Sequence, residues 1–119
     1  MDLKLPDGYQ FKRVECARMV NDALTLVFED DTALTFADHG QSCCEDRYMT
    51  CELDDLDKLT GDRLISAEVL SAPDGVSEDE EHEVQFLHIT FSSGYVLTCE
   101  THNEHNGFYG GFDVSIEAS

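Results

Sequence analysis

The chain has 119 residues, and its 26 Asp and Glu outnumber its 7 Lys and Arg to give a formal charge of −19 at pH 7. This length fits a single domain over residues 1–119, and the charge disfavours direct binding to nucleic acid or anionic lipid, which requires cationic side chains. No apolar stretch is long enough to span a membrane and the first residues lack a signal-peptide core, so we expect a soluble, cytoplasmic protein.

The first third of the chain predicts three antiparallel strands joined by short turns. Residues 15–20, 23–30 and 32–38 alternate apolar and polar side chains with a period of two, and Asn or Asp occupies both connections. The apolar face of the second and third strands consists of Leu24, Leu26, Phe28, Leu34 and Phe36. We therefore expect a meander with one buried face.

The middle of the chain predicts another strand and then a short helix. Residues 47–53 again alternate with a period of two. Residues 54–61 begin with an aspartate that can cap a helix, Asp54 or Asp55, and end at Gly61, which can stop it. The spacing predicts a helix of about two turns.

The remaining extended segments are residues 63–72, 84–93, 95–102 and 108–117. Between the first two, residues 73–83 are rich in Pro, Gly, Ser and acids, which predicts an exposed, mobile acidic loop. Asn106 and Gly107 form a strong hairpin signal before the last segment. Together the elements predict an α+β, mainly β fold, either a curled antiparallel sheet or two β layers, with one short helix.

The five cysteines are Cys16, Cys43, Cys44, Cys51 and Cys99. An odd count without an export signal argues against a disulfide framework. We expect buried free thiols that behave as small hydrophobic side chains.

Histidines and cysteines also raise the possibility of a zinc site. The stretch HGQSCCE contains His39, Cys43 and Cys44, and the later stretch HNEH contains His102 and His105. Two loops could each supply two ligands, but a Cys-x-x-Cys knuckle is missing from the sequence. Adjacent cysteines in extended backbone also point to opposite faces, so only one of the two would bind easily.

A Cys/His nucleophile is the corresponding catalytic alternative. Cys43 or Cys44 would pair with His39, His88 or His102. Arg47 is the one cation near these thiols in the sequence, and little else there would lower a thiol pKa. Pairs of carboxylates that could act in acid–base catalysis are not a specific signal in a chain with so many acids. The sequence therefore favours a packing role for the Cys43-Cys44 stretch and predicts neither a catalytic residue, nor a metal, nor another cofactor.

The acids are concentrated in a part of the chain that lacks cations. Arg63 is the last basic residue, and residues 64–119 contain 11 acids. The candidate partner-binding acids are Glu68, Asp74, Glu78, Asp79, Glu80, Glu81, Glu83, Glu100, Glu104 and Asp113, with Glu117 as a further member. If they gather on one exterior surface, they can imitate a line of phosphates and fit a basic groove.

Three motifs carry a resemblance to a known family: HGQSCCE at 39–45, DDLDKLTG at 54–61 and NGFYGGFDVSI at 106–116. In these motifs the chain resembles a small domain family of unknown function found in phage and prophage genomes. The resemblance covers roughly residues 23–117. Members carry a tryptophan before the Asn-Gly pair, whereas this chain has none. The resemblance implies a compact α+β domain and a phage-related origin. Together with the expected cytoplasmic location, this leads us to expect the protein in the cytoplasm of a bacterial host.

These observations lead to one functional hypothesis and one alternative. The hypothesis is a non-enzymatic, acidic protein that binds and blocks a positively charged host protein or ribonucleoprotein complex that handles nucleic acid, such as a defence complex. The alternative is a small zinc-stabilised module, or a Cys/His enzyme, that uses His39, Cys43, His102 and His105.

Overall fold

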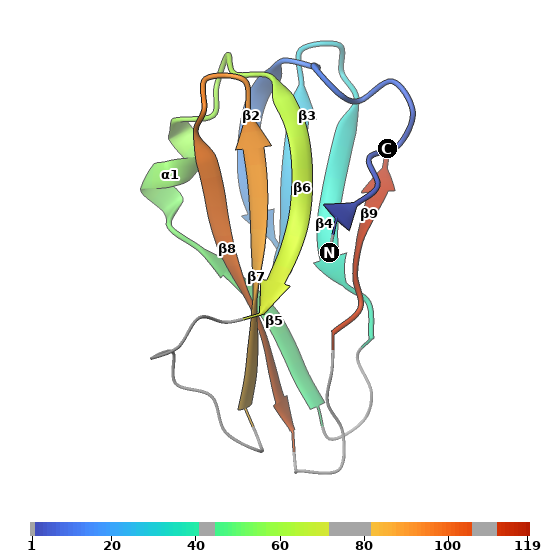
Figure 1. The fold of residues 1–119 in the computed structure, drawn as a ribbon, viewed down its shortest axis with the longest axis vertical. Helices are drawn as coiled ribbons and strands as arrows, with labels where there is room; N and C mark the ends of the chain where they lie inside the picture. Colours follow the sequence, from blue (N-terminus) through green and yellow to red (C-terminus); the bar gives the residue numbers. More distant parts are fainter. Residues whose placement is uncertain (1, 41–44, 72–81, 106–111) are drawn as a thin grey trace.

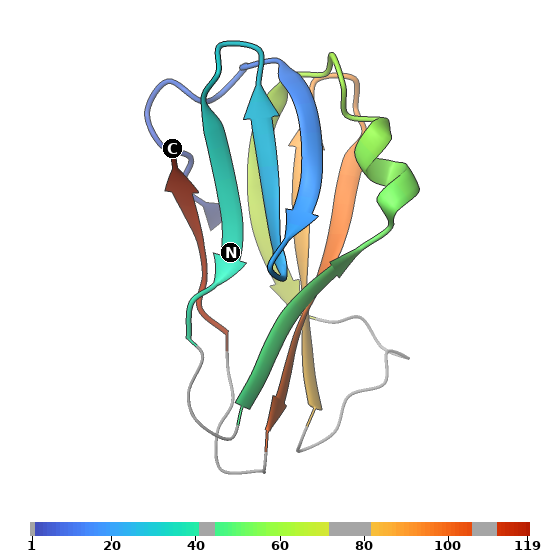
Figure 2. The same cartoon turned by 180° about the vertical axis from the view of Figure 1, so that it is seen from behind.

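The computed structural model describes residues 2–40, 45–71, 82–105 and 112–119. These residues form two antiparallel sheets that face each other as the layers of a sandwich (Figure 1). Figure 2 shows the four-stranded sheet from the opposite side, with the short helix at the edge of the sandwich. The prediction of a mainly β fold with one short helix is confirmed, and of the two arrangements left open, a curled sheet or two layers, the structure has the two layers.

The five-stranded sheet has the strand order β1-β6-β7-β8-β5. Its strands are β1 (Asp2–Leu3), β6 (Leu64–Ser71), β7 (His82–Phe91), β8 (Val96–His105) and β5 (Glu45–Cys51). The four-stranded sheet has the order β2-β3-β4-β9, with β2 (Val14–Val20), β3 (Ala23–Phe28), β4 (Ala33–Asp38) and β9 (Val114–Ala118). The helix α1 (Leu53–Asp57) lies between β5 and β6 in the sequence.

The predicted meander is present as β2, β3 and β4. The β2–β3 turn consists of Asn21 and Asp22, whose φ angles are 51° and 61°. Positive φ at both central residues is typical of the two-residue turn that matches the twist of paired strands, and Asn and Asp tolerate it better than other non-glycine residues. The five apolar side chains predicted to share one face of β3 and β4 are all fully buried.

The predicted boundaries differ from the structure at the helix. The helix has five residues and its N-cap is Glu52, which makes no side-chain capping bond. Neither Asp54 nor Asp55 is the cap; both lie within the first turn. Gly61 has φ +86°, so it does form a turn, but one that follows Lys58, the C-cap of the helix.

The strand ends also differ. β7 begins at His82, so the last two residues of the predicted loop 73–83 belong to a strand, and the rest of that loop lies outside the described residues, as do Asn106 and Gly107. β8 continues to His105 because its end pairs with β5 and β7, which the local sequence cannot reveal. β9 begins at Val114, several residues after the predicted start at 108.

The core lies between the two sheets. Leu24, Leu26 and Phe36 of the four-stranded sheet pack in one cluster with side chains of the five-stranded sheet such as Leu87 and Ile89. Leu56 and Leu59 add the helical segment to this cluster. Because side chains alternate along a strand, the residues of β5, β6, β7 and β8 that lie between core positions point away from the core. They form the outer face of the five-stranded sheet.

Candidate functional site

The outer face of the five-stranded sheet collects acids and histidines from four strands. We define this outer face by Asp46, Tyr48, Glu68, His82, His88, Glu100, His102 and Glu104. Cross-strand register aligns Asp46, Glu104 and His82 in one row across β5, β8 and β7. This row lies at the ends of the three strands that extend beyond β2 and β3 (Figures 1 and 2).

The row begins with two acids directly opposite each other. Asp46 of β5 is the cross-strand partner of Glu104 on β8, and both are exposed. Like charges in directly opposed positions destabilise a sheet. The fold therefore tolerates a local repulsion at this edge of the outer face.

His102 lies at the centre of the outer face. Its ring stacks on the Tyr48 ring, with 4.6 Å between centroids and 7° between planes. Its Nδ1 lies 3.0 Å from Nε2 of His82, and its Nε2 lies 3.4 Å from a carboxylate oxygen of Glu100. Thr50 Oγ1 is 3.3 Å from the same Nε2.

Burial lowers the pKa of His102, although the Glu100 carboxylate opposes this shift. Burial also raises the pKa of Tyr48, with a further contribution from the charge of Glu104. Near neutral pH the Tyr48 and His102 side chains are therefore uncharged.

Lysines and arginines form ion pairs elsewhere. Among the described residues their ion pairs are Lys12–Asp30, Arg13–Glu29, Arg47–Asp38 and Lys58–Asp55. All four acids precede Arg63 in the sequence. Glu68, Glu100 and Glu104 have no Lys or Arg ion pair within the described part of the chain, and Glu100 meets only a histidine, His102.

The structure divides the predicted set of partner-binding acids. Glu68, Glu100 and Glu104 share the outer face. Glu83 lies in the alternate register of β7, opposite Asn103, so it points to the other side of the sheet. Asp113 precedes β9 in the second sheet and its backbone N–H donates to Asp38. Asp74 and Glu78 to Glu81 lie outside the described residues.

Glu117 belongs to the opposite side of the sandwich. It lies on β9, where it is exposed and its carboxylate lies 3.5 Å from His39 Nε2. Nδ1 of the same histidine lies 2.6 Å from Ser115 Oγ. His39 therefore contacts a strand that is distant in the sequence.

The structure does not bring together the two described side chains of the alternative zinc set. His39 contacts the outer face of the four-stranded sheet, whereas His102 lies on the outer face of the five-stranded sheet. These faces are separated by the core, so the two histidines cannot share one ion. Cys43 and the side chain of His105 lie outside what the structure describes. Among the side chains that it does describe, no three His, Cys, Asp or Glu are placed to hold a metal.

Sequence reasoning missed three of the eight residues that define the outer face. Asp46, Tyr48 and His82 were not candidates, because Asp46 and Tyr48 reach Glu104 and His102 only through the pairing of β5 with β8. The alternation in residues 46–50 was the available signal. It fixes which residues share a side of β5, but not which strand lies beside it.

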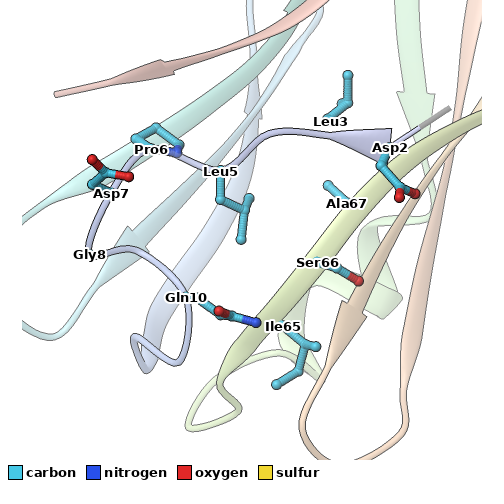
Figure 3. Close-up of a pocket in the computed structure, with 10 residues that line it drawn as sticks. All are labelled: Asp2, Leu3, Leu5, Pro6, Asp7, Gly8, Gln10, Ile65, Ser66 and Ala67. Carbon is cyan, nitrogen blue, oxygen red and sulfur yellow. The ribbon is translucent and has the colours of Figure 1, made fainter.

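A cavity of about 470 Å³ lies at the other edge of the same sheet. Figure 3 shows the N-terminal segment beside β6, with Leu5 in the space between them. The lining combines apolar side chains such as Ile65 with the carboxylates of Asp2 and Asp7. Among the described residues this lining contains no histidine, cysteine, lysine or arginine.

None of the helices in the described ranges has the length and apolar character needed to cross a membrane. A family model described as a domain of unknown function (DUF7448) matches residues 9–114. No curated protein matches the chain, and no solved structure matches it either.

Proposed function

Since the chain belongs to the DUF7448 family, whose description assigns no activity, we propose a function from the outer face itself: this face binds a basic partner protein. The observation that carries the proposal is the distribution of ion pairs. The described Lys and Arg ion pairs involve acids that precede Arg63, whereas Glu68, Glu100 and Glu104, on one sheet face, form no Lys or Arg ion pair among the residues that the structure describes.

The spacing of the carboxylates supports a groove as the complementary surface. Opposed residues such as Asp46 and Glu104 lie on neighbouring strands, which are about 4.8 Å apart. Glu100 and Glu104 are four residues apart on β8, which corresponds to about 13 Å. A two-dimensional array of this kind offers a basic groove several negative charges at once, as a nucleic-acid backbone does.

The partner class follows from the charge. A groove evolved for nucleic acid carries the cations that such an array would attract, and steering by a protein of charge −19 accelerates the encounter. We propose that the partner is a nucleic-acid-handling protein or ribonucleoprotein of a bacterial host, that the family member is of phage origin, and that binding blocks the groove. The neutral Tyr48 and His102 rings add apolar contact area at the centre.

A pull-down with matched variants tests the proposal. The experiment compares the wild-type chain with a face variant, Glu100→Lys with Glu104→Lys, and with a control variant, Glu15→Lys with Glu117→Lys. Each protein is immobilised and exposed to bacterial lysate at about 0.05 and 0.5 M salt, because the screening length shortens severalfold over this range. Each substitution raises the charge by two, so both variants carry −15 instead of −19. Glu15 and Glu117 are exposed on the four-stranded sheet.

We expect the wild type and the control to retain the same basic proteins at low salt, and the face variant to lose most of them. Raising the salt should release them from the wild type. Retention of the same proteins by the face variant, or binding that is indifferent to salt, would contradict the proposal. Circular dichroism and urea unfolding verify that each variant is folded.

A further inference from the structure

Two cysteines face each other across neighbouring strands. Cys51, the last residue of β5, is the direct cross-strand partner of Cys99 in β8. Directly opposed residues of an antiparallel pair have Cα atoms about 4.5–5.5 Å apart and side chains on the same face. A disulfide needs a Cα separation of about 4.4–6.8 Å, so this pair can close with little backbone movement.

The two thiols differ in access. Cys99 is fully buried in the core, whereas Cys51 is half-buried at the edge of the sheet. Cys51 lines a cavity of about 290 Å³ together with Glu52, Asp55 and Glu100. It also lines a second cavity of about 410 Å³ between the end of β5 and the β2–β3 turn. A small molecule can therefore reach the first sulfur but not the second.

We propose that Cys51 and Cys99 are a redox-active pair that is oxidised to an intramolecular disulfide by exchange with small neutral or cationic disulfides. Cys51 is the attacking residue and Cys99 the resolving one. The charge preference follows from the carboxylates of Glu52, Asp55 and Glu100 around the entry, which repel an anionic disulfide such as oxidised glutathione.

The exchange proceeds in two balanced steps. The Cys51 thiolate attacks one sulfur of R–S–S–R, forming a mixed disulfide and releasing one RS⁻. The Cys99 sulfur, after losing its proton to solvent, then attacks the Cys51 sulfur and releases the second RS⁻. Two protein thiols are thereby oxidised to one disulfide, the small disulfide is reduced to two thiols, and the two protons end on the leaving groups.

The hydrogen bond between the thiols supports this assignment of roles. It lowers the pKa of Cys51, against the opposing effects of burial and of the nearby Asp55 charge. The same hydrogen bond, together with burial, raises the pKa of Cys99. Cys51 is therefore the thiol that ionises first, and the attack by Cys99 is the slow step.

Tryptic mapping of the intact wild-type chain tests the proposal. Cleavage after Lys and Arg separates the cysteines into fragments 14–18, 19–47, 48–58 and 64–119, so that Cys51 and Cys99 lie in different fragments and neither shares one with another cysteine. After treatment with cystamine, a cationic disulfide, we expect 48–58 to be linked to 64–119. A fragment 48–58 that stays free, or that stops at the mixed disulfide, would overturn the pairing.

Two variants and a second oxidant define the roles. Cys99→Ala should stop at the mixed disulfide on fragment 48–58, and Cys51→Ala should abolish the link altogether. Cys16→Ser, which removes an exposed thiol on β2, is the control and should leave the link unchanged. Cystamine should react at Cys51 at least tenfold faster than oxidised glutathione at low salt. Equal rates would overturn the proposed preference for neutral and cationic disulfides.

Discussion

The Asp38 carboxylate and the Arg47 guanidinium meet at 2.8 Å with only 6% and 7% of their side chains exposed. Asp38 Oδ1 also accepts the backbone N–H groups of Gly40 and Asp113. One carboxylate thus joins the end of β4, the start of β5 and the segment before β9. This ion pair lies at one end of the sandwich, next to Asp46 of the outer face, which directly precedes Arg47 in the chain.

We expect Arg47→Met to lower the free energy of unfolding by about 3–5 kcal/mol, because it leaves the buried Asp38 carboxylate without its cation. Arg18→Met is the control, since Arg18 is exposed on β2 and its loss should cost less than about 0.5 kcal/mol. Urea unfolding monitored by circular dichroism measures both. Equal effects would show that the buried pair does not stabilise the fold.

We expect Gly40→Ala to destabilise the protein by about 1–3 kcal/mol through overpacking. A Cβ at this position would lie 2.8 Å from Cζ of Arg47, so the guanidinium would have to move away from Asp38. In the Arg47→Met background the same substitution should cost clearly less. A double-mutant cycle of unfolding free energies measures this coupling, and additive effects would contradict the steric explanation.

We expect Asp46→Lys to stabilise the protein by about 0.2–1 kcal/mol, because it replaces a directly opposed pair of like charges with an attractive pair to Glu104. Glu117→Lys is the matched control: it changes the charge equally but removes the carboxylate that contacts His39. Thermal unfolding at low salt compares the two. A stabilised Asp46→Lys variant that also binds less partner would indicate that the repulsion is retained for binding.

We expect His102 to titrate below the ordinary histidine pKa of about 6.5, because burial lowers its pKa. As the pH falls through the histidine pKa of the unfolded chain, the unfolded state becomes protonated at His102 before the folded state does. Acidification therefore favours the unfolded state, and His102 contributes a loss of stability. Histidine NMR titration measures the midpoint. His102→Phe keeps a ring against Tyr48 and should lose less stability between pH 7 and 5, and a midpoint at or above 6.5 would contradict the expectation.

We expect the pH midpoint for alkylation of Cys51 to rise in Cys99→Ala, because the hydrogen bond that lowers its pKa is lost. Cys99→Ser retains a donor and should keep the midpoint closer to that of the wild type. Iodoacetamide kinetics, followed on fragment 48–58, provides the measurement. If the two variants give the same midpoint as the wild type, Cys99 does not influence the ionisation of Cys51.

The local alternation of the sequence determined most strands and one face of the core. Leu24, Leu26 and Phe36 repeat with a period of two, and burying them requires one particular side of β3 and β4 to face inward. The turn at Asn21-Asp22 was equally predictable, because its residue types tolerate the backbone that a two-residue hairpin needs. The excess of acids after Arg63 was visible from composition alone.

Only the tertiary structure decided which strands that are distant in the sequence become neighbours. The pairing of β5 with β8 brings Asp46 to Glu104, Tyr48 to His102 and Cys51 to Cys99. The same fold sends His39 and Glu117 to the opposite side of the sandwich. The physical reason is that side-chain alternation specifies the face of a strand locally, whereas strand order depends on burying two apolar faces against each other over long sequence separations.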